Sequence, residues 1–383
     1  MAEQLSSPPA GRWQAAWEPL LEIGRTGSGG YRRFAWTEED RLLREWFAGE
    51  AAARGGEVVP DRAGNLWAWW GDPDAEPGVV LGSHLDSVPE GGAFDGPLGV
   101  VSALLAVESV GPLRKPVAVV CFADEEGARF GTACAGSRLL TGALAPEKAL
   151  GLKDADGVTM AEARGDVPAA DPEALRRIDC FVELHVEQGR ALEVPVGLAT
   201  EIWPHGRWRF DLRGQANHAG TTRLEDRDDP VLAFASLALR ARATAEDLGM
   251  LATFGKLQVS PNAVNAVPGE VRAWLDARAP SGQLLQRLLD DLGGSPQQES
   301  WTSAVRFDRA LADRLSGCLS DVPRLPTGAG HDAGVLQEHG IPTAMLFVRN
   351  PTGISHAPEE HAELDDCLAG VAALEAVLRE LAG

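Results

Sequence analysis

The chain has 383 residues, of which 44% are hydrophobic, and its formal net charge is −21. A chain of this length usually needs more than one hydrophobic core, so we expect a globular protein with two domains of about 100–250 residues each. The acidic excess excludes nucleic acid as the expected partner, because nucleic-acid-binding surfaces carry a basic stripe. The sequence shows neither a leader peptide pattern nor about 18 consecutive uncharged apolar residues, so we expect a soluble, cytoplasmic protein that binds no membrane.

Taken in chain order, residues 1 to about 55 are predicted to be helical, with Trp13, Trp17 and Leu20 at helical spacing. From about 56 to 204, short apolar runs alternate with helical patterns. This alternation predicts an α/β domain with a mixed, mostly parallel sheet and helices on both faces. The five cysteines are scattered, with no CxxC pair, and we expect them to be reduced.

The character of the sequence changes near residue 206. Residues 206–303 contain strand and helix patterns in the order β-α-β-β-α-β, which predicts an inserted α+β domain. Apolar and polar residues alternate in EVRAWLDAR, residues 270–278, as in a strand with one exposed face. After residue 304 the pattern of the first part returns. The main domain is therefore expected to be discontinuous, with residues 1–205 and 304–383 in one domain.

Four apolar runs are each followed by potential metal ligands. VVLGS precedes His84, VAVVCFA precedes residues 124–126 (Asp-Glu-Glu), CFVEL precedes His185, and AMLFVRNPTGIS precedes His356. Open α/β sheets bind ligands at the carboxyl ends of their strands, where these side chains would meet. The pattern therefore predicts a metal site at one edge of the sheet.

Two further aspartates lie in the loop after His84. Asp86 can hydrogen-bond the imidazole of His84 and fix its tautomer. Asp95 precedes Pro97 and a helical run, which is typical of an N-cap but also compatible with a carboxylate that bridges two cations. Taken singly, the three carboxylates of residues 124–126 could form a solvated loop, and a lone histidine after a strand is more often structural. Their coincidence at several strand ends favours a metal site.

Eight motifs, in order and spacing, resemble the dinuclear-metal amidohydrolases of peptidase family M20. Within that family they are most similar to the N-carbamoyl-L-amino-acid hydrolase and allantoate amidohydrolase branch. The resemblance covers roughly residues 60 to 365. The motifs are HLDSVPEGGAFDGPLGVVSALLAVE, FADEEGARFG, ELHVEQG, GQANHAGTT, SPNAVNAVPGEV, LDAR, GAGHDA and GISHAPEE.

The resemblance implies two divalent metal ions, Zn, Mn, Ni or Co. It makes Glu125 the general base that activates a metal-bridging water and Asp86 the partner of His84. The histidine at position 185 favours the carbamoylase branch, because many peptidases of the family carry a carboxylate there. The implied ligands of the first metal are His84, Asp95 and His185, and those of the second are the bridging Asp95, Glu126 and His356.

The resemblance also implies a site for a small substrate that carries a carboxylate. Gln188, His218, Asn265 and Arg278 match substrate-binding residues. Arg278 would bind the substrate carboxylate, and His218 would help to stabilise the oxyanion formed during hydrolysis. Members of the branch are typically homodimers that pair through the inserted domain, which also acts as a lid.

The sequence thus predicts metal-dependent hydrolysis of a linear amide or ureido C–N bond in an N-carbamoyl-L-amino acid or allantoate. A second hypothesis is a dipeptidase or aminoacylase of the same family that cleaves an ordinary amide. A third is a non-catalytic binding protein that kept the fold. The intact set of ligands and Glu125 argues against the third hypothesis, and His185 argues against the second. The sequence does not choose the metal or the individual ureido substrate.

Overall fold

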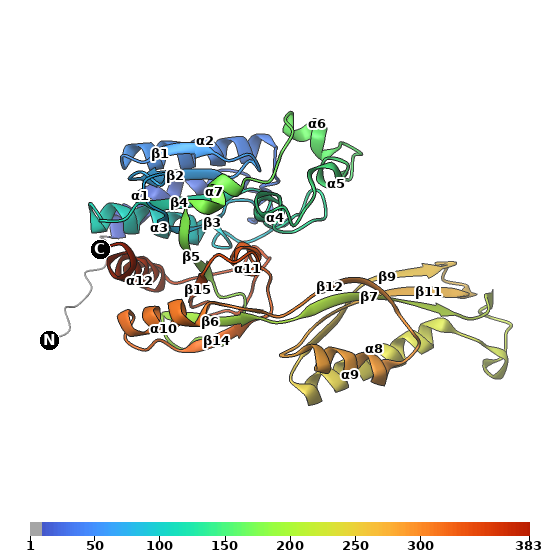
Figure 1. The fold of residues 1–383 in the computed structure, drawn as a ribbon. Coiled ribbons are helices and arrows are strands. Elements are labelled where there is room, and N and C mark those ends of the chain that lie inside the picture. Colours follow the sequence, from blue (N-terminus) through green and yellow to red (C-terminus); the bar gives the residue numbers. More distant parts are fainter. Residues whose placement is uncertain (1–9) are drawn as a thin grey trace. The chain divides into compact units, whose positions relative to one another are not determined.

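The computed structural model describes residues 10–383, which divide into two compact units. The first unit contains the described residues up to Thr200 together with Arg306–Gly383, and the second contains Glu201–Val305. The first unit is therefore discontinuous in sequence, and the second is an insertion, coloured yellow-green to orange in Figure 1. The predicted boundaries, 205/206 and 303/304, differ from these by five and two residues.

The first unit is organised around a nine-stranded mixed sheet with a parallel centre. Its four central strands, β4, β3, β5 and β15, run parallel to one another. The strands β2 and β6 flank this centre and are antiparallel to it, and β1 is antiparallel to β2. The strands are β1 (Glu57–Pro60), β2 (Leu66–Trp70), β3 (Gly78–His84), β4 (Val117–Phe122), β5 (Ile178–Val186), β6 (Val196–Ile202), β13 (Val305–Arg306), β14 (Arg324–Thr327) and β15 (Thr343–Val348).

Helices pack on both faces of this sheet. Val79 and Leu81 of β3 belong to a large core shared with α1, α2, α3, α10 and α12, whereas Val80, between them, is buried on the other face. The helices α7 and α11 contact β5, and α4 packs against both. The helices are α1 (Ala10–Trp17), α2 (Glu38–Ala53), α3 (Pro97–Val110), α4 (Ala135–Thr141), α5 (Pro146–Leu150), α6 (Met160–Arg164), α7 (Pro172–Arg176), α10 (Arg309–Cys318), α11 (Asp332–Glu338) and α12 (Leu364–Ala382).

The helical prediction for residues 1–55 is confirmed only in part. Residues 1–9 lie outside the described residues. Trp13, Trp17 and Leu20 are buried on α1 and the 3-10 helix that follows it, Glu18–Leu21, as their spacing predicted. The stretch 22–37, however, is irregular and leads into α2. Four of the five cysteines are buried and all five are free, as expected.

The second unit is a four-stranded antiparallel sheet that carries two helices. Its strand order is β12-β7-β11-β9, and a separate two-stranded ribbon joins β8 and β10. Along β11, Ala273, Leu275 and Ala277 are buried in the unit's core and the residues between them are not, which confirms the predicted alternation. The elements are β7 (His205–Arg213), β8 (Asn217–His218), η2 (Leu224–Asp226), α8 (Pro230–Leu248), β9 (Leu251–Ser260), β10 (Ala266–Val267), β11 (Glu270–Arg278), α9 (Gly282–Leu292) and β12 (Gln297–Thr302).

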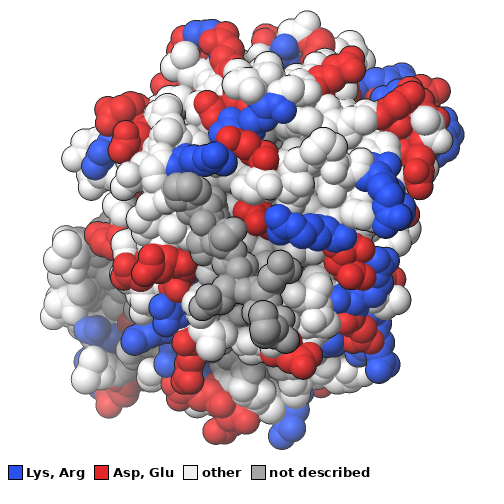
Figure 2. Space-filling view, turned by 90° about the vertical axis from the view of Figure 1, so that its left-hand side faces the viewer, with Lys and Arg blue, Asp and Glu red and all other residues white. Residues whose placement is uncertain are grey.

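Two surface properties bear on the expected partners. On the face shown in Figure 2, basic and acidic side chains are interspersed and no continuous basic stripe is visible. Within residues 10–383, no helix combines the length and the hydropathy that crossing a membrane requires.

Candidate metal centre

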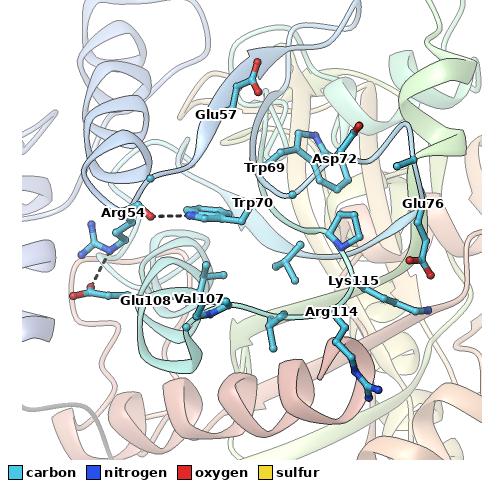
Figure 3. Close-up of a pocket in the computed structure, with 18 residues that line it drawn as sticks. Arg54, Glu57, Trp69, Trp70, Asp72, Glu76, Val107, Glu108, Arg114 and Lys115 are labelled. Atoms are coloured by element: carbon cyan, nitrogen blue, oxygen red, sulfur yellow. Dashed lines mark hydrogen bonds and ion pairs between the residues drawn. The ribbon is translucent and has the colours of Figure 1, made fainter.

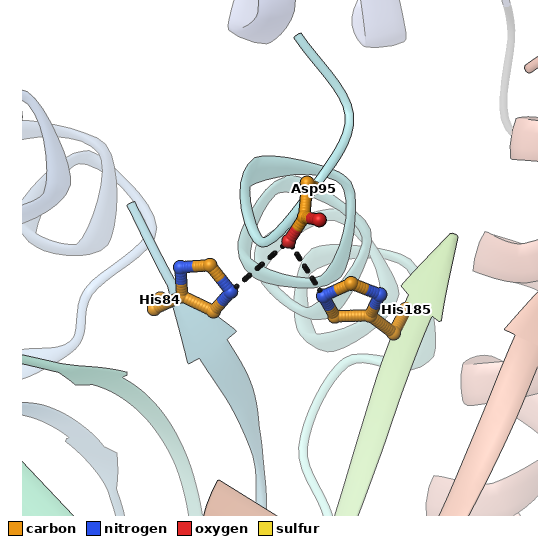
Figure 4. Close-up of side chains that lie close together, drawn as sticks. All are labelled: His84, Asp95 and His185. Atoms are coloured by element: carbon orange, nitrogen blue, oxygen red, sulfur yellow. Dashed lines mark ion pairs between the residues drawn. The ribbon is translucent and has the colours of Figure 1, made fainter. Parts of the chain in front are cut away.

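Two histidines and an aspartate meet where the central strands end. His84 is the last residue of β3, His185 lies near the end of β5, and Asp95 lies in the loop before α3 (Figure 4). The Oδ1 atom of Asp95 is 3.4 Å from His84 Nε2 and 3.0 Å from His185 Nε2. All three side chains are buried. This geometry could hold one metal ion among the three side chains.

A second group of ligands uses the other oxygen of the same aspartate. Asp95 Oδ2 is 3.3 Å from His356 Nε2, which in turn is 3.6 Å from Glu126 Oε2. Glu126 follows β4 closely, and His356 follows β15. The two oxygens of Asp95 therefore face two different groups of candidate ligands.

Several buried polar atoms of the two groups lack a hydrogen-bond partner in the part of the chain that the structure describes, as expected of atoms that bind a metal ion. His84 Nε2, His185 Nε2 and Glu126 Oε1 are buried and have no hydrogen-bond partner within residues 10–383. A buried polar atom without a partner is costly, and divalent ions bound by the two groups would offset this cost. Imidazole and carboxylate are ligands that Zn, Mn, Co and Ni accept. The donor set therefore fits first-row divalent metals.

The ionisation of the carboxylates agrees with this assignment. Burial alone would raise the pKa of Asp95, but His185, His356 and His84 together hold it well below its ordinary value, so Asp95 is ionised. Burial and the neighbouring Asp95 raise the pKa of Glu126 to about 7. A bound cation would offset this repulsion between the two carboxylates.

Asp86 connects the first ligand group to the loop after β4. His84 Nδ1 is 3.2 Å from the backbone carbonyl oxygen of Asp86 and 3.4 Å from its Oδ1 atom. The two carboxylate oxygens of Asp86 accept hydrogen bonds from the backbone N–H groups of Glu125 (3.1 Å) and Glu126 (3.0 Å). Asp86 therefore orients both the imidazole of His84 and the segment that carries Glu125 and Glu126.

We expect Asp86→Ala to weaken metal binding by about 10- to 100-fold, as is typical when the partner of a ligating histidine is removed. The reason is that the loop at Glu125 would lose the carboxylate that binds its N–H groups, and His84 would keep only its contact with the backbone carbonyl of residue 86. Competition with a chromogenic chelator measures the affinity. Unchanged affinity would show that Asp86 does not orient the centre.

Glu125 lies beside His84 of the first group and belongs to neither group. Its Oε2 atom is 3.8 Å from His84 Nε2, and its Oε1 atom accepts a hydrogen bond from Cys134 Sγ at 3.5 Å. Burial raises the pKa of Glu125 well above its ordinary value. A buried carboxylate that stands next to the ligands but is not one of them is suited to take and return a proton.

The structure also brings in His331, to which the sequence assigned no role. This histidine precedes α11, is 3% exposed, and its ring lies 4.6 Å from that of His185. Its Nδ1 atom is 4.0 Å from Glu125 Oε1, and neither ring nitrogen has a hydrogen-bond partner among the described residues. Burial lowers its pKa well below the ordinary value, so the ring is neutral. His331 lies in the loop that follows the strand β14, and this position could have identified it as a candidate site residue.

Gln188 lies directly against the second ligand group. Its Nε2 atom is 2.7 Å from Asp95 Oδ2 and 3.1 Å from His356 Nε2. The structure thus brings Gln188 to the candidate centre, where its predicted contact with a substrate stays a prediction.

The other predicted substrate residues lie in the inserted unit at two separate places, with His218 and Asn265 near the start of β11 and Arg278 at its end. His218 is exposed on β8 and pairs with Ala266 of β10, and the carbonyl of Asn265 accepts a hydrogen bond from Ala219 at 3.0 Å. Arg278 ends β11, where its Nε atom is 3.0 Å from Asp276. Their contribution to the centre in the first unit stays a prediction.

A pocket elsewhere in the first unit is a poor alternative site. It has a volume of about 790 Å³ and is lined by Trp69 and Trp70 among other residues (Figure 3). Two of its basic side chains already have acidic partners: Arg54 lies 3.0 Å from Glu108, and Lys115 lies 2.8 Å from Asp179. None of the candidate ligands lines it. The candidate active site is therefore the group of ligands at the strand ends and not this cavity.

The fold and the paired groups of histidines and carboxylates define an α/β protein with a candidate metal centre at the carboxyl edge of its sheet. The model of the peptidase family M20/M25/M40 matches residues 80–380, and the chain belongs to this family. The resemblance inferred from the motifs is therefore confirmed.

Individual relatives narrow the comparison to amidohydrolases. The chain is 35% identical over 402 aligned positions to an N-carbamoyl-L-amino acid amidohydrolase of Geobacillus stearothermophilus, covering 96% of this chain and 98% of the relative. It is 32% identical to the allantoate amidohydrolase of Escherichia coli, with 95% and 96% coverage. A solved amidase of the hydantoinase/carbamoylase family from Burkholderia multivorans superposes with a TM-score of 0.87 at 30% identity, covering 98% of both chains.

Proposed function

We propose that the protein hydrolyses a linear C–N bond in an N-carbamoyl-L-amino acid, in allantoate or in a related ureido acid. The observation that carries this proposal is the position of Asp95, whose two oxygens face two groups of metal ligands, with Glu125 beside them. The functions of the relatives, whose similarity covers almost the whole chain, support the substrate class.

The ligand groups would hold two divalent ions, with His84 and His185 on one side of Asp95 and Glu126 and His356 on the other. When bound, such ions polarise a carbonyl group and lower the pKa of bound water to about 7. The chain leaves the choice among Zn, Mn, Ni and Co open, because mixed histidine and carboxylate ligands accept all four.

Glu125 would carry the proton through the reaction. It takes a proton from the attacking water and later donates it to the leaving nitrogen. Its Oε2 atom faces the ligands, and Cys134 holds its Oε1 atom in place. With an N-carbamoyl substrate, the departing carbamate decomposes to ammonia and carbon dioxide.

Residues of the inserted unit would bind the rest of the substrate. In this proposal Arg278 forms two parallel hydrogen bonds with the substrate carboxylate, which its planar guanidinium suits. His218 donates to the oxyanion, a contribution of about 3–4 kcal/mol for a preorganised donor. Asn265 and Gln188 complete the contacts, and movement of the inserted unit as a lid excludes water.

Arg278→Ala is expected to raise KM for carboxylate substrates by about 10- to 100-fold, as the loss of hydrogen bonds to a charged group predicts. Steady-state kinetics with an N-carbamoyl-L-amino acid measures the change. Arg272→Ala is the matched control, because Arg272 lies on the same strand and is exposed. If KM is the same in both variants, Arg278 does not bind the carboxylate.

A homodimer formed through the inserted unit is part of the proposal. The helix α8 exposes Leu232 (68%) and Leu239 (73%), and β9, an edge strand of its sheet, exposes Leu251 and Leu257. Exposed apolar side chains next to an unpaired strand edge favour pairing with a second chain. In such a dimer, His218 and Asn265 would act in the site of the neighbouring subunit.

Leu239→Glu is expected to shift the protein towards monomer, because it places a charge in the apolar face of α8. Sedimentation velocity of the wild type and the variant at equal concentration measures this shift. A monomeric wild type would contradict the dimer proposal.

The substrate class is tested by product analysis. The metal-loaded protein is incubated with N-carbamoyl-L-amino acids, allantoate, the matching N-acetyl amino acids and dipeptides. Ammonia released from the ureido substrates is the expected result. Cleavage of dipeptides or N-acetyl amino acids alone would show that the protein is a peptidase or an aminoacylase.

A further inference from the structure

Glu360 contacts the loop that carries the shared aspartate. It lies four residues after His356 in the sequence, yet its Oε1 atom accepts hydrogen bonds from the backbone N–H groups of both Phe94 and Asp95, each at 2.9 Å. The side chain is 5% exposed. One carboxylate therefore joins the segment that holds His356 to the segment that holds Asp95.

The loop leaves no space on either side of this contact. A Cβ atom on Gly92 would overlap the side chain of Glu360, and a Cβ atom on Gly96 would overlap the ring of His84. The φ angle of Gly92 lies outside the left-handed region, so the contact with Glu360 is what excludes a side chain there. The loop of residues 92–96 is thus held between Glu360 and a metal ligand.

Stability alone is a poor explanation for this carboxylate. The Oε2 atom of Glu360 is buried and has no hydrogen-bond partner within the described part of the chain, and its neighbour Asp95 is also acidic. Burying a carboxylate with one unsatisfied oxygen beside a like charge costs free energy of folding. The presence of a carboxylate at this position therefore suggests a role in the candidate metal centre.

We propose that Glu360 is a positioning residue of the metal centre. By holding the backbone N–H groups of Phe94 and Asp95, it fixes Asp95 so that one oxygen faces His84 and His185 and the other faces His356. The inference rests on the proposed function, since it concerns how the chain holds the metal ions.

The test is metal affinity rather than activity. Metal-free wild type and variants compete with a chromogenic chelator for Mn²⁺ and for Zn²⁺, and bound metal is counted after dialysis. Glu360→Ala is expected to weaken binding by about 10- to 100-fold, the range for residues that orient ligands. Glu360→Gln keeps an oxygen acceptor for both N–H groups and is expected to stay within threefold of the wild type. Glu359→Ala, which removes an exposed neighbouring carboxylate, is the control and should bind as the wild type does.

Gly92→Ala gives a second test that leaves Glu360 in the chain. The added Cβ displaces the Glu360 side chain and should weaken metal binding about as much as Glu360→Ala. If Glu360→Ala does not fold, Gly92→Ala still tests whether Glu360 positions Asp95. Wild-type affinity in both Glu360→Ala and Gly92→Ala would overturn the inference, as would a Glu360→Gln variant as weak as Glu360→Ala. A wild-type protein that binds no metal would instead refute the proposed function.

Discussion

Replacing Glu125 by Gln is expected to lower kcat by about 10²- to 10⁴-fold, the usual contribution of a general base. The amide keeps the size of the side chain and its contact with Cys134, but it cannot take a proton from water. Metal content should be unchanged, because Glu125 belongs to neither ligand group. Turnover and bound metal are measured on the same preparation.

Glu126→Gln is the comparison variant for Glu125→Gln. Glu126→Gln changes the adjacent carboxylate in the same way, but Glu126 belongs to the second ligand group. It should therefore lose metal, and with it activity. A Glu125→Gln enzyme that keeps both its metals and nearly wild-type turnover would show that Glu125 is not the base.

Asp95→Ala is expected to remove metal from both ligand groups at once and to lower turnover by at least about 100-fold, since even outer residues of such centres contribute 10- to 100-fold. The reason is that Asp95 belongs to both groups, through Oδ1 and Oδ2. His356→Ala, in contrast, removes a ligand of one group only. Elemental analysis after dialysis should give a lower metal content for Asp95→Ala than for His356→Ala. Two bound ions in Asp95→Ala would show that this aspartate does not bridge the centre.

The candidate ligands predicted from the sequence lie close together for a geometric reason. His84 and His185 lie at or near the ends of β3 and β5, and residues 124–126 follow β4. These strands are parallel neighbours, and such strands end at the same edge of a sheet. Parallel strands buried on both faces give uninterrupted apolar runs, which made their ends easy to locate. The antiparallel strand β2 and the two-residue strands β8 and β10 carry a weaker pattern and were not predicted individually.

The residues that support the ligands could not be predicted in the same way. Glu360 acts on backbone N–H groups about 265 positions earlier, and a hydrogen bond to the main chain leaves no mark in the partner's sequence. Cys134 contacts Glu125 only because the loop after β4 folds back on itself, with the N–H of Ala135 donating to the carbonyl of Asp124 at 3.0 Å. Periodicity and motif spacing indicate which side chains point into the core. The contacts of Glu360 and Cys134 depend instead on the conformation of loops, which these patterns do not reveal.

The most direct test of the central claim is ammonia release from an N-carbamoyl-L-amino acid and from allantoate while metal-free protein is titrated with Mn²⁺. Activity should be absent without metal and should rise until about two ions are bound per chain, as expected for a centre with two ligand groups that share Asp95. Full activity in the metal-free protein would contradict the account. So would the absence of ammonia from every ureido substrate when both ions are bound.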